Sequence, residues 1–329
     1  MLEHGGNLAA ASQQYGIALG DWLDLSTGIN PHGYPITVIP PEAWQRLPLE
    51  NDGLVETACA YYGCRFALPT AGSQAALQVL PQLRAGSRFN KSAKVAMPRL
   101  MYQEHAKAWQ RHGHEVIRFD TGPDQAILQQ ADVLLLCNPN NPTGTRFTTE
   151  QLLEWHAELA QRGGWLIIDE AFMDATPDGS IAQHANQEGL FVLRSLGKFF
   201  GLAGARVGFL LAAEAMLQAA QEIIGPWSVA GPSRHAAKTA LEDQAWQQGT
   251  RQQLLNDSRR LADLLAQHSL QPTGGTTLFQ FVVMPQAAAW HQHLARQGIW
   301  VRLFPDVPAL RFGLPPENAW DRLRDALQN

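Results

Sequence analysis

The sequence is poor in cysteine, in charge and in long apolar runs. Its only cysteines are Cys59, Cys64 and Cys137, an odd number without the paired Cys and His spacing of a zinc site. Charged residues make up 17% of the 329 residues and leave a net charge of −5. No apolar run approaches the roughly 20 residues that cross a bilayer. These absences argue against a metal centre, a membrane span and a basic surface for nucleic acid.

The amino terminus and the thiols predict a cytoplasmic protein. The first residues contain neither the basic region nor the apolar region of a secretory signal peptide. We therefore expect the three cysteines to be reduced thiols. With 45% hydrophobic residues the chain can bury a large core, and its length predicts two domains.

Apolar strand-like runs alternate with amphipathic helical stretches from about residue 55 to residue 240. The runs are Lys94–Met97, Glu115–Phe119, Asp132–Cys137, Trp165–Ile168, Phe191–Leu193 and Val207–Leu211. Continuous apolar strands separated by helices indicate an α/β domain whose mainly parallel sheet is covered on both faces. In such sheets ligands bind outside the carboxyl ends of the strands.

The pattern changes beyond Pro232, where an α+β domain is predicted. His235–Gln267 has the pattern of one long polar helical segment, and strands are expected at Leu278–Val283 and Ile299–Leu303. A terminal helix is expected at Pro316–Ala326. The predicted organisation is a segment 1–45 that packs on the small domain and the active site, a large domain 46–234 and a small domain 235–329.

Two polar segments follow apolar strands of the large domain. The string NPNNPTG, from Asn138 to Gly144, favours a rigid turn that directs side-chain amides at a ligand, although a plain strand-to-helix turn would use the same residues. Asp169 follows the run WLII. It is either a helix cap or the partner of a buried cation, and in a pocket it would keep a pyridinium nitrogen protonated.

Lys198 lies in an apolar neighbourhood, next to Phe199. Burial lowers the pKa of an amine and favours Schiff-base formation, whereas most lone lysines are solvated surface residues. Ser195 and Arg206 can both turn toward one anion. The helix start at Gly72-Ser73 offers backbone N–H groups to a phosphate, although such turns are common without a ligand.

Together, the strings NPNNPTG, IIDEAF and SLGK resemble the fold-type I family of pyridoxal-phosphate (PLP) enzymes. The resemblance implies PLP as cofactor, a homodimer, and a large domain with a mainly parallel seven-stranded sheet beside a smaller α+β C-terminal domain. It assigns catalytic roles to Lys198, which binds the cofactor, and to Asp169, which pairs with the pyridine nitrogen. The other cofactor residues that it implies are Asn141 at the ring oxygen, Tyr102 stacked on the ring, and Gly72, Ser73, Ser195 and Arg206 at the phosphate.

The amino-terminal segment is similar to that of threonine-phosphate decarboxylases of cobalamin biosynthesis. The similar strings are HGGN, which begins at His4, and DLSTGINP, which begins at Asp24. These enzymes convert O-phospho-L-threonine into (R)-1-amino-2-propanol phosphate and CO₂. The substrate residues that the resemblance implies are Gly28, Asn141 and Arg311 for the carboxylate, and His4, Gly5 and Arg302 for the phosphate.

Two other functions stay open from the sequence. A histidinol-phosphate-type aminotransferase would exchange amines with a 2-oxo acid, but such enzymes usually have Tyr where this chain has Phe172. A non-catalytic module with the same fold would be expected to have lost at least one of the site residues. Release of CO₂ without a keto acid distinguishes the decarboxylase from the aminotransferase. The expected ligand is a phosphorylated amino acid, with no metal, nucleic acid or membrane partner.

Overall fold

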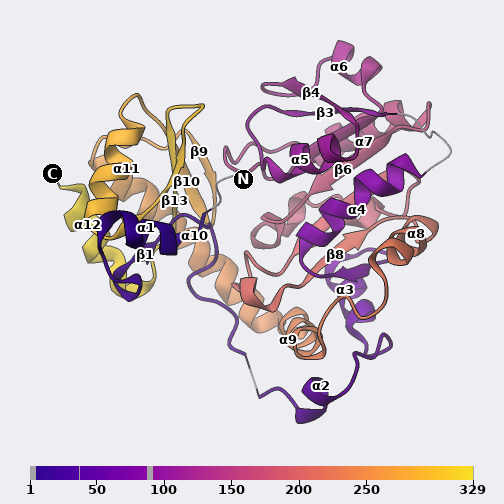
Figure 1. Cartoon of the computed structure of the whole chain (residues 1–329), viewed down its shortest axis with the longest axis horizontal. Helices are drawn as coiled ribbons and strands as arrows, with labels where there is room; N and C mark the ends of the chain where they lie inside the picture. Colours follow the sequence, from indigo (N-terminus) through magenta and orange to yellow (C-terminus); the bar gives the residue numbers. More distant parts are fainter. Residues whose placement is uncertain (1–4, 37, 87–91, 329) are drawn as a thin grey trace. The chain divides into compact units, whose positions relative to one another are not determined.

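A computed structural model of the chain describes residues 5–36, 38–86 and 92–328 (Figure 1). It divides into two compact units. The larger unit comprises the described parts of Tyr34–Asn141 and Arg146–Gln247, and the smaller unit those of Met1–Gly33, Pro142–Thr145 and Gln248–Asn329. The boundaries between the units thus lie near residues 33 and 247. The boundaries predicted from the sequence are residues 45 and 234.

A seven-stranded sheet forms the centre of the larger unit, in the order β2-β8-β7-β6-β5-β3-β4. The strands are β2 (Leu68–Thr70), β3 (Lys94–Pro98), β4 (Glu115–Phe119), β5 (Val133–Cys137), β6 (Trp165–Asp169), β7 (Leu190–Ser195) and β8 (Gly208–Leu211). Strand β8 is antiparallel to both neighbours, and the other adjacent pairs are parallel. The predicted mainly parallel seven-stranded sheet is confirmed.

Helices cover this sheet because its strands are apolar on both faces. The helices of the larger unit are α2 (Pro41–Gln45), α3 (Leu54–Tyr62), α4 (Ser73–Ala85), α5 (Glu104–Arg111), α6 (Gln125–Gln130), α7 (Thr149–Ala160), α8 (Glu214–Ile224) and α9 (Gly231–Glu242). Val95, Leu135 and Ile167 share one core cluster with side chains of α4, α5 and α8. The alternate strand residues, such as Leu136 and Ile168, are equally buried, as expected for a sheet between two layers.

The described part of the smaller unit contains two sheets and four α-helices. Strand β1 (Leu23–Asp24) pairs in parallel with β11 (Ile299–Trp300). The second sheet has the order β12-β13-β10-β9 and is antiparallel. Its strands are β9 (Gly274–Thr276), β10 (Phe279–Val283), β12 (Arg302–Phe304) and β13 (Ala309–Gly313). The α-helices of the smaller unit are α1 (Leu8–Tyr15), α11 (Ala287–Arg296), α12 (Trp320–Leu327) and most of α10 (Gln244–Gln267).

Two predicted elements are each split in the structure. The segment His235–Gln267 belongs to two helices, because Asp243 ends α9 and its carboxylate accepts the backbone N–H of Trp246 in the first turn of α10. The predicted strand Ile299–Leu303 is divided at Val301, because β11 pairs with β1 and β12 pairs with β13. Among the described residues no helix is both long and apolar enough to cross a bilayer.

Candidate active site

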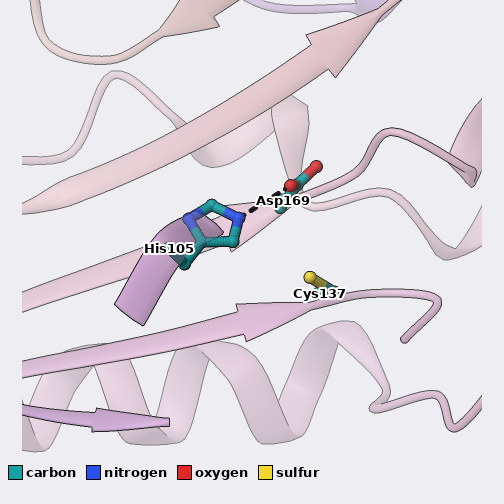
Figure 2. Close-up of side chains that lie close together, drawn as sticks. All are labelled: His105, Cys137 and Asp169. Atoms are coloured by element: carbon teal, nitrogen blue, oxygen red, sulfur yellow. Dashed lines mark hydrogen bonds and ion pairs between the residues drawn. The ribbon is translucent and has the colours of Figure 1, made fainter. Parts of the chain in front are cut away.

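Asp169 ends β6, and its carboxylate is held by a histidine that the sequence analysis does not identify. The Nε2 atom of His105, on α5, lies 2.8 Å from Asp169 Oδ2, and both side chains are buried (Figure 2). The other oxygen, Oδ1, accepts the backbone N–H of Ala171 at 3.0 Å. A buried carboxylate needs such partners because an uncompensated charge is costly in the interior. The pair fixes the direction in which the carboxylate points.

Cys137 is the third member of this buried group. It ends β5 and pairs with Asp169 across the parallel ladder. Burial, followed by the nearby Asp169 charge, raises the pKa of the Cys137 thiol well above its usual value. Donor atoms of His105, Cys137 and Asp169 lie within 4.8 Å of one another, which is close enough for a metal ion. His105 and Asp169 already bond to each other, so two of these three side chains hold each other in place.

The sulfur of Cys137 also links two of the predicted cofactor residues. It accepts backbone N–H groups from Tyr102 and Asn141. Burial and the Asp169 charge raise the pKa of Tyr102 to about 12, so its hydroxyl stays protonated and donates to Gln74 Oε1 at 3.2 Å. The structure therefore gathers Tyr102, Asn141 and Asp169 around the carboxyl ends of β5 and β6.

The four predicted phosphate residues meet at the start of α4. Strand register places Gly208 opposite Ser195 on one side and opposite Thr70 on the other. A Cβ atom at Gly208 would lie only 2.4 Å from the backbone nitrogen of Ser73, so glycine permits this close approach. The helix start, with its free N–H groups and positive dipole, thus lies beside the Ser195 strand end.

Arg206 completes this cradle. A Cβ atom at Gly72, which has a φ of +72°, would lie 2.7 Å from Arg206 Nη2, so the guanidinium rests against the glycine backbone. Arg206 itself has a left-handed φ of 52°, which non-glycine residues rarely adopt. Such strain is typical of functional positions. Cation, hydroxyl and helix N-terminus together form a candidate binding site for a phosphate group.

Lys198 follows the end of β7 and is half-buried. Its Nζ atom lies 5.3 Å from the centre of the Phe172 ring, and Phe172 is itself buried in the segment after Asp169. The neighbours Leu196 and Phe199 have no exposed surface. The lysine is therefore positioned by a well-packed apolar support. A lysine, a fixed carboxylate and a phosphate cradle are the groups that PLP needs, so the described residues fit this cofactor.

Two arginines of the smaller unit lie directly opposite each other, Arg302 on β12 and Arg311 on β13. Burial, followed by the Arg302 charge, lowers the pKa of Arg311 to about 10. Like charges facing each other across a ladder are destabilising unless an anion is bound. Arg311 donates to the carbonyl of Ser26. This pair forms a candidate anion site.

The amino-terminal residues predicted to bind substrate are also gathered at Ser26. A Cβ atom at Gly5 would lie 2.4 Å from the Ser26 carbonyl oxygen, and Gly6 N–H donates to Ser26 Oγ at 2.7 Å. Gly28 has a φ of +62°, and its backbone nitrogen lies near Gly313 of β13. His4 lies outside the described residues. Gly5, Gly28 and Arg311 are thus neighbours of one loop in the smaller unit.

Sequence reasoning did not identify His105 and Cys137. A signal for His105 was available, because it lies four residues before the fully buried Trp109 and hence on the same face of α5. A polar residue on a buried helix face needs a partner. Cys137 gave a weaker signal, as the last residue of an apolar run.

The profile of the family "Aminotransferase class I and II" matches residues 52–327 of the chain. The chain belongs to this family. It is 52% identical to the threonine-phosphate decarboxylase of Pseudomonas aeruginosa, over 99% of this chain and 97% of that protein. It is 38% identical to the threonine-phosphate decarboxylase of a Sinorhizobium species, over 98% and 97% of the two chains.

A similar solved structure is that of the histidinol-phosphate aminotransferase from Sinorhizobium meliloti in complex with pyridoxal-5'-phosphate. It has a TM-score of 0.84 at 20% identity, and covers 99% of this chain and 94% of that chain. This likeness shows the shared fold. The resemblance drawn from the motifs is therefore confirmed at the level of the family and the fold.

Proposed function

We propose that this chain is a PLP-dependent carboxy-lyase that converts O-phospho-L-threonine into (R)-1-amino-2-propanol phosphate and CO₂, a reaction of cobalamin biosynthesis. The observation that carries the proposal is the 52% identity to a threonine-phosphate decarboxylase over 99% of the chain. Two features of the chain support it independently. They are the lysine, the fixed carboxylate and the candidate phosphate cradle of the larger unit, which fit PLP, and the pair of arginines in the smaller unit.

Asp169 and His105 act on the pyridine nitrogen of the cofactor. When bound, PLP serves as an acceptor for the electron pair left by a bond that breaks at the substrate Cα. The Asp169 carboxylate holds a proton at the ring nitrogen, and His105 keeps the carboxylate in place with a 2.8 Å contact. The fixed charge needs no reorganisation during the reaction, so it stabilises the transition state effectively.

Lys198 carries the cofactor and supplies a proton. Its amine would hold the cofactor covalently, and the same amine would be the group that donates a proton to the substrate Cα. Phe172, 5.3 Å from Nζ, has no hydroxyl group with which to bind the ring oxygen, in contrast to the tyrosine usual in the related aminotransferases. The residues that hold the substrate carboxylate would decide which bond at Cα breaks, because they fix the orientation of the substrate.

Anion-binding groups hold the two acidic ends of the substrate. Arg311, with Asn141 and the backbone at Gly28, is assigned to the carboxylate, and Arg302 with Gly5 and His4 to the phosphate. In support of this assignment, Arg302 and Arg311 face each other in the antiparallel ladder, which brings two cationic side chains together. Arginine suits both groups because its planar fork can form two parallel hydrogen bonds.

The first experiment is an assay of CO₂ and amine from O-phospho-L-threonine with the PLP-loaded protein and no keto acid. Equal amounts of CO₂ and aminopropanol phosphate are expected. Lys198→Ala should abolish both products. The matched control Lys238→Ala removes a half-buried lysine paired with Glu242 and should leave the rate unchanged. If no CO₂ forms and histidinol phosphate converts the cofactor to its amine form, the chain is an aminotransferase and the proposal is wrong.

We also propose a cytoplasmic homodimer. Its support is an exposed apolar stretch that includes Ile36, Val38, Trp44, Leu47 and Leu49, with Trp44 68% exposed. Exposed apolar residues clustered in one short segment are typical of an interface. The described cysteines are all free thiols, as is usual in the cytoplasm. Analytical ultracentrifugation should give a mass of twice the 36.2 kDa of one chain. The double variant Trp44→Glu with Leu47→Glu should lower this mass toward that of one chain. A monomeric parent protein would refute the dimer.

A further inference from the structure

Cys59 and Cys64 are brought together by the way helix α3 ends. Gly63 takes a left-handed φ of 65°, and its N–H donates to the carbonyl of Cys59. The N–H of Cys64 donates to the same carbonyl at 3.1 Å. In this type of helix end the chain turns back on the last turn, so that the residue after the glycine packs on the residue that provides the carbonyl. The two cysteine side chains occupy these two positions.

The two cysteines are neighbours at this helix end but lie in unequal surroundings. Both are free thiols, and each thiol shifts the pKa of the other. Cys59 is half-buried, and the hydrogen bond from Cys64 lowers the pKa of its thiol. Cys64 is buried, and donation to Cys59 together with burial raises the pKa of its thiol. An accessible thiol with a lowered pKa beside a second, protected thiol is the arrangement of a reactive cysteine and its resolving partner.

We propose that Cys59 and Cys64 form a modification site at which low-molecular-weight disulfides produce a reversible intrachain disulfide. The backbone hydrogen bond between the two residues keeps them within the few-ångström separation that a disulfide requires. The site is distinct from the PLP-binding residues, none of which is a cysteine of this pair.

The reaction has two steps. The Cys59 thiolate attacks one sulfur of the small disulfide, whose S–S bond breaks and releases one small thiolate. The sulfur of Cys64 then attacks the Cys59 sulfur of the mixed disulfide, and the second small thiolate leaves with the Cys64 proton. The two protein thiols are oxidised and one small disulfide is reduced to two thiols. An excess of small thiol reverses both steps.

The site lies beside a buried ion cluster. Tyr62, between the two cysteines in sequence, has its ring 4.4 Å from the Arg194 guanidinium, which pairs with Glu170 and Asp174. The positive charge of Arg194 also acts on Cys64 and lowers its pKa slightly against the larger opposing effects.

The experiment treats the folded holoenzyme with oxidised glutathione and reads the products by mass. Trypsin leaves both cysteines in the peptide from Leu47 to Arg65, which contains no internal Lys or Arg. We expect this peptide to lose two hydrogen atoms without retaining glutathione, and a small dithiol to restore them. Cys137, which is buried and has a raised pKa, should stay unmodified.

Two serine variants separate the roles of the cysteines. Cys64→Ser should retain one glutathione at Cys59, because the resolving thiol is missing. Cys59→Ser should remain unmodified, because Cys64 is protected, and Cys137→Ser should behave like the parent protein. Cofactor absorbance and circular dichroism identify any variant that fails to fold. A parent protein that keeps glutathione without closing the disulfide, or that closes it only after unfolding in urea, would overturn the proposal.

Discussion

The pairing of His105 with Asp169 leads to a quantitative prediction for cofactor binding. In His105→Ala the buried carboxylate loses its 2.8 Å partner and keeps the single contact from Ala171. A hydrogen bond to a charged group contributes about 1.5–3 kcal/mol. Since every 1.4 kcal/mol is a factor of ten in affinity, the apoenzyme of the variant should bind PLP about 10–100-fold more weakly.

The assay is a titration of apoenzyme with PLP, followed by the visible absorbance of the lysine-bound cofactor. His112→Ala is the matched control, because His112 caps the same helix and its side chain bonds to the nearby Ala108 carbonyl. We expect control affinity equal to that of the parent protein. Equal affinities for all three proteins, with folding unchanged, would refute the argument that His105 positions Asp169 for the cofactor.

Three further predictions follow from other contacts. Gly72→Ala should displace the Arg206 guanidinium and so weaken PLP binding by about 10–100-fold in the same titration. The control is Gly113→Ala. Gly113 has a similar φ, but an added Cβ there would meet no atom within 4 Å, so the PLP affinity should stay unchanged. Arg302→Met should raise KM for O-phospho-L-threonine by about tenfold or more in the CO₂ assay. The control Arg296→Met changes an exposed arginine and should leave KM unchanged. Equal effects of the two variants would show that Arg302 does not bind the substrate. Arg194→Met leaves the buried Glu170 and Asp174 without their cation. It should lower the free energy of unfolding, measured in urea, by about 3–5 kcal/mol. The control Arg99→Met breaks the exposed pair with Asp120 and should lower this free energy by at most about 1 kcal/mol.

Six of the seven strands of the larger unit were predictable, because most of them are apolar and buried on both faces. The short strand β2 was not predicted. The run Asp132–Cys137 differs from β5 by one residue, and Glu115–Phe119 is identical to β4. The N-terminus of α7 was also predictable, since Thr148 caps it and Gln151 completes a capping box. These features depend on neighbours within a few residues, which the sequence displays directly.

The breaks in regular elements were harder to predict. Nothing in the polarity of His235–Gln267 marks Asp243 as an end, because its role depends on which backbone N–H its carboxylate meets. Val301 likewise has an ordinary strand side chain. It ends one strand because the residues before and after it pair with different sheets, and sheet membership is a long-range property.

The sequence by itself determined the chemistry that is possible: a lysine in an apolar setting, an acid after a buried strand, a Gly-Ser helix start and a rigid Asn-Pro turn. Only the tertiary structure decided which of these groups meet. His105 reaches Asp169 across 64 positions of sequence, and Gly208 brings Ser195 to the start of α4. The reason is that local residues specify strands and caps, whereas the order and register of strands depend on packing of the whole sheet.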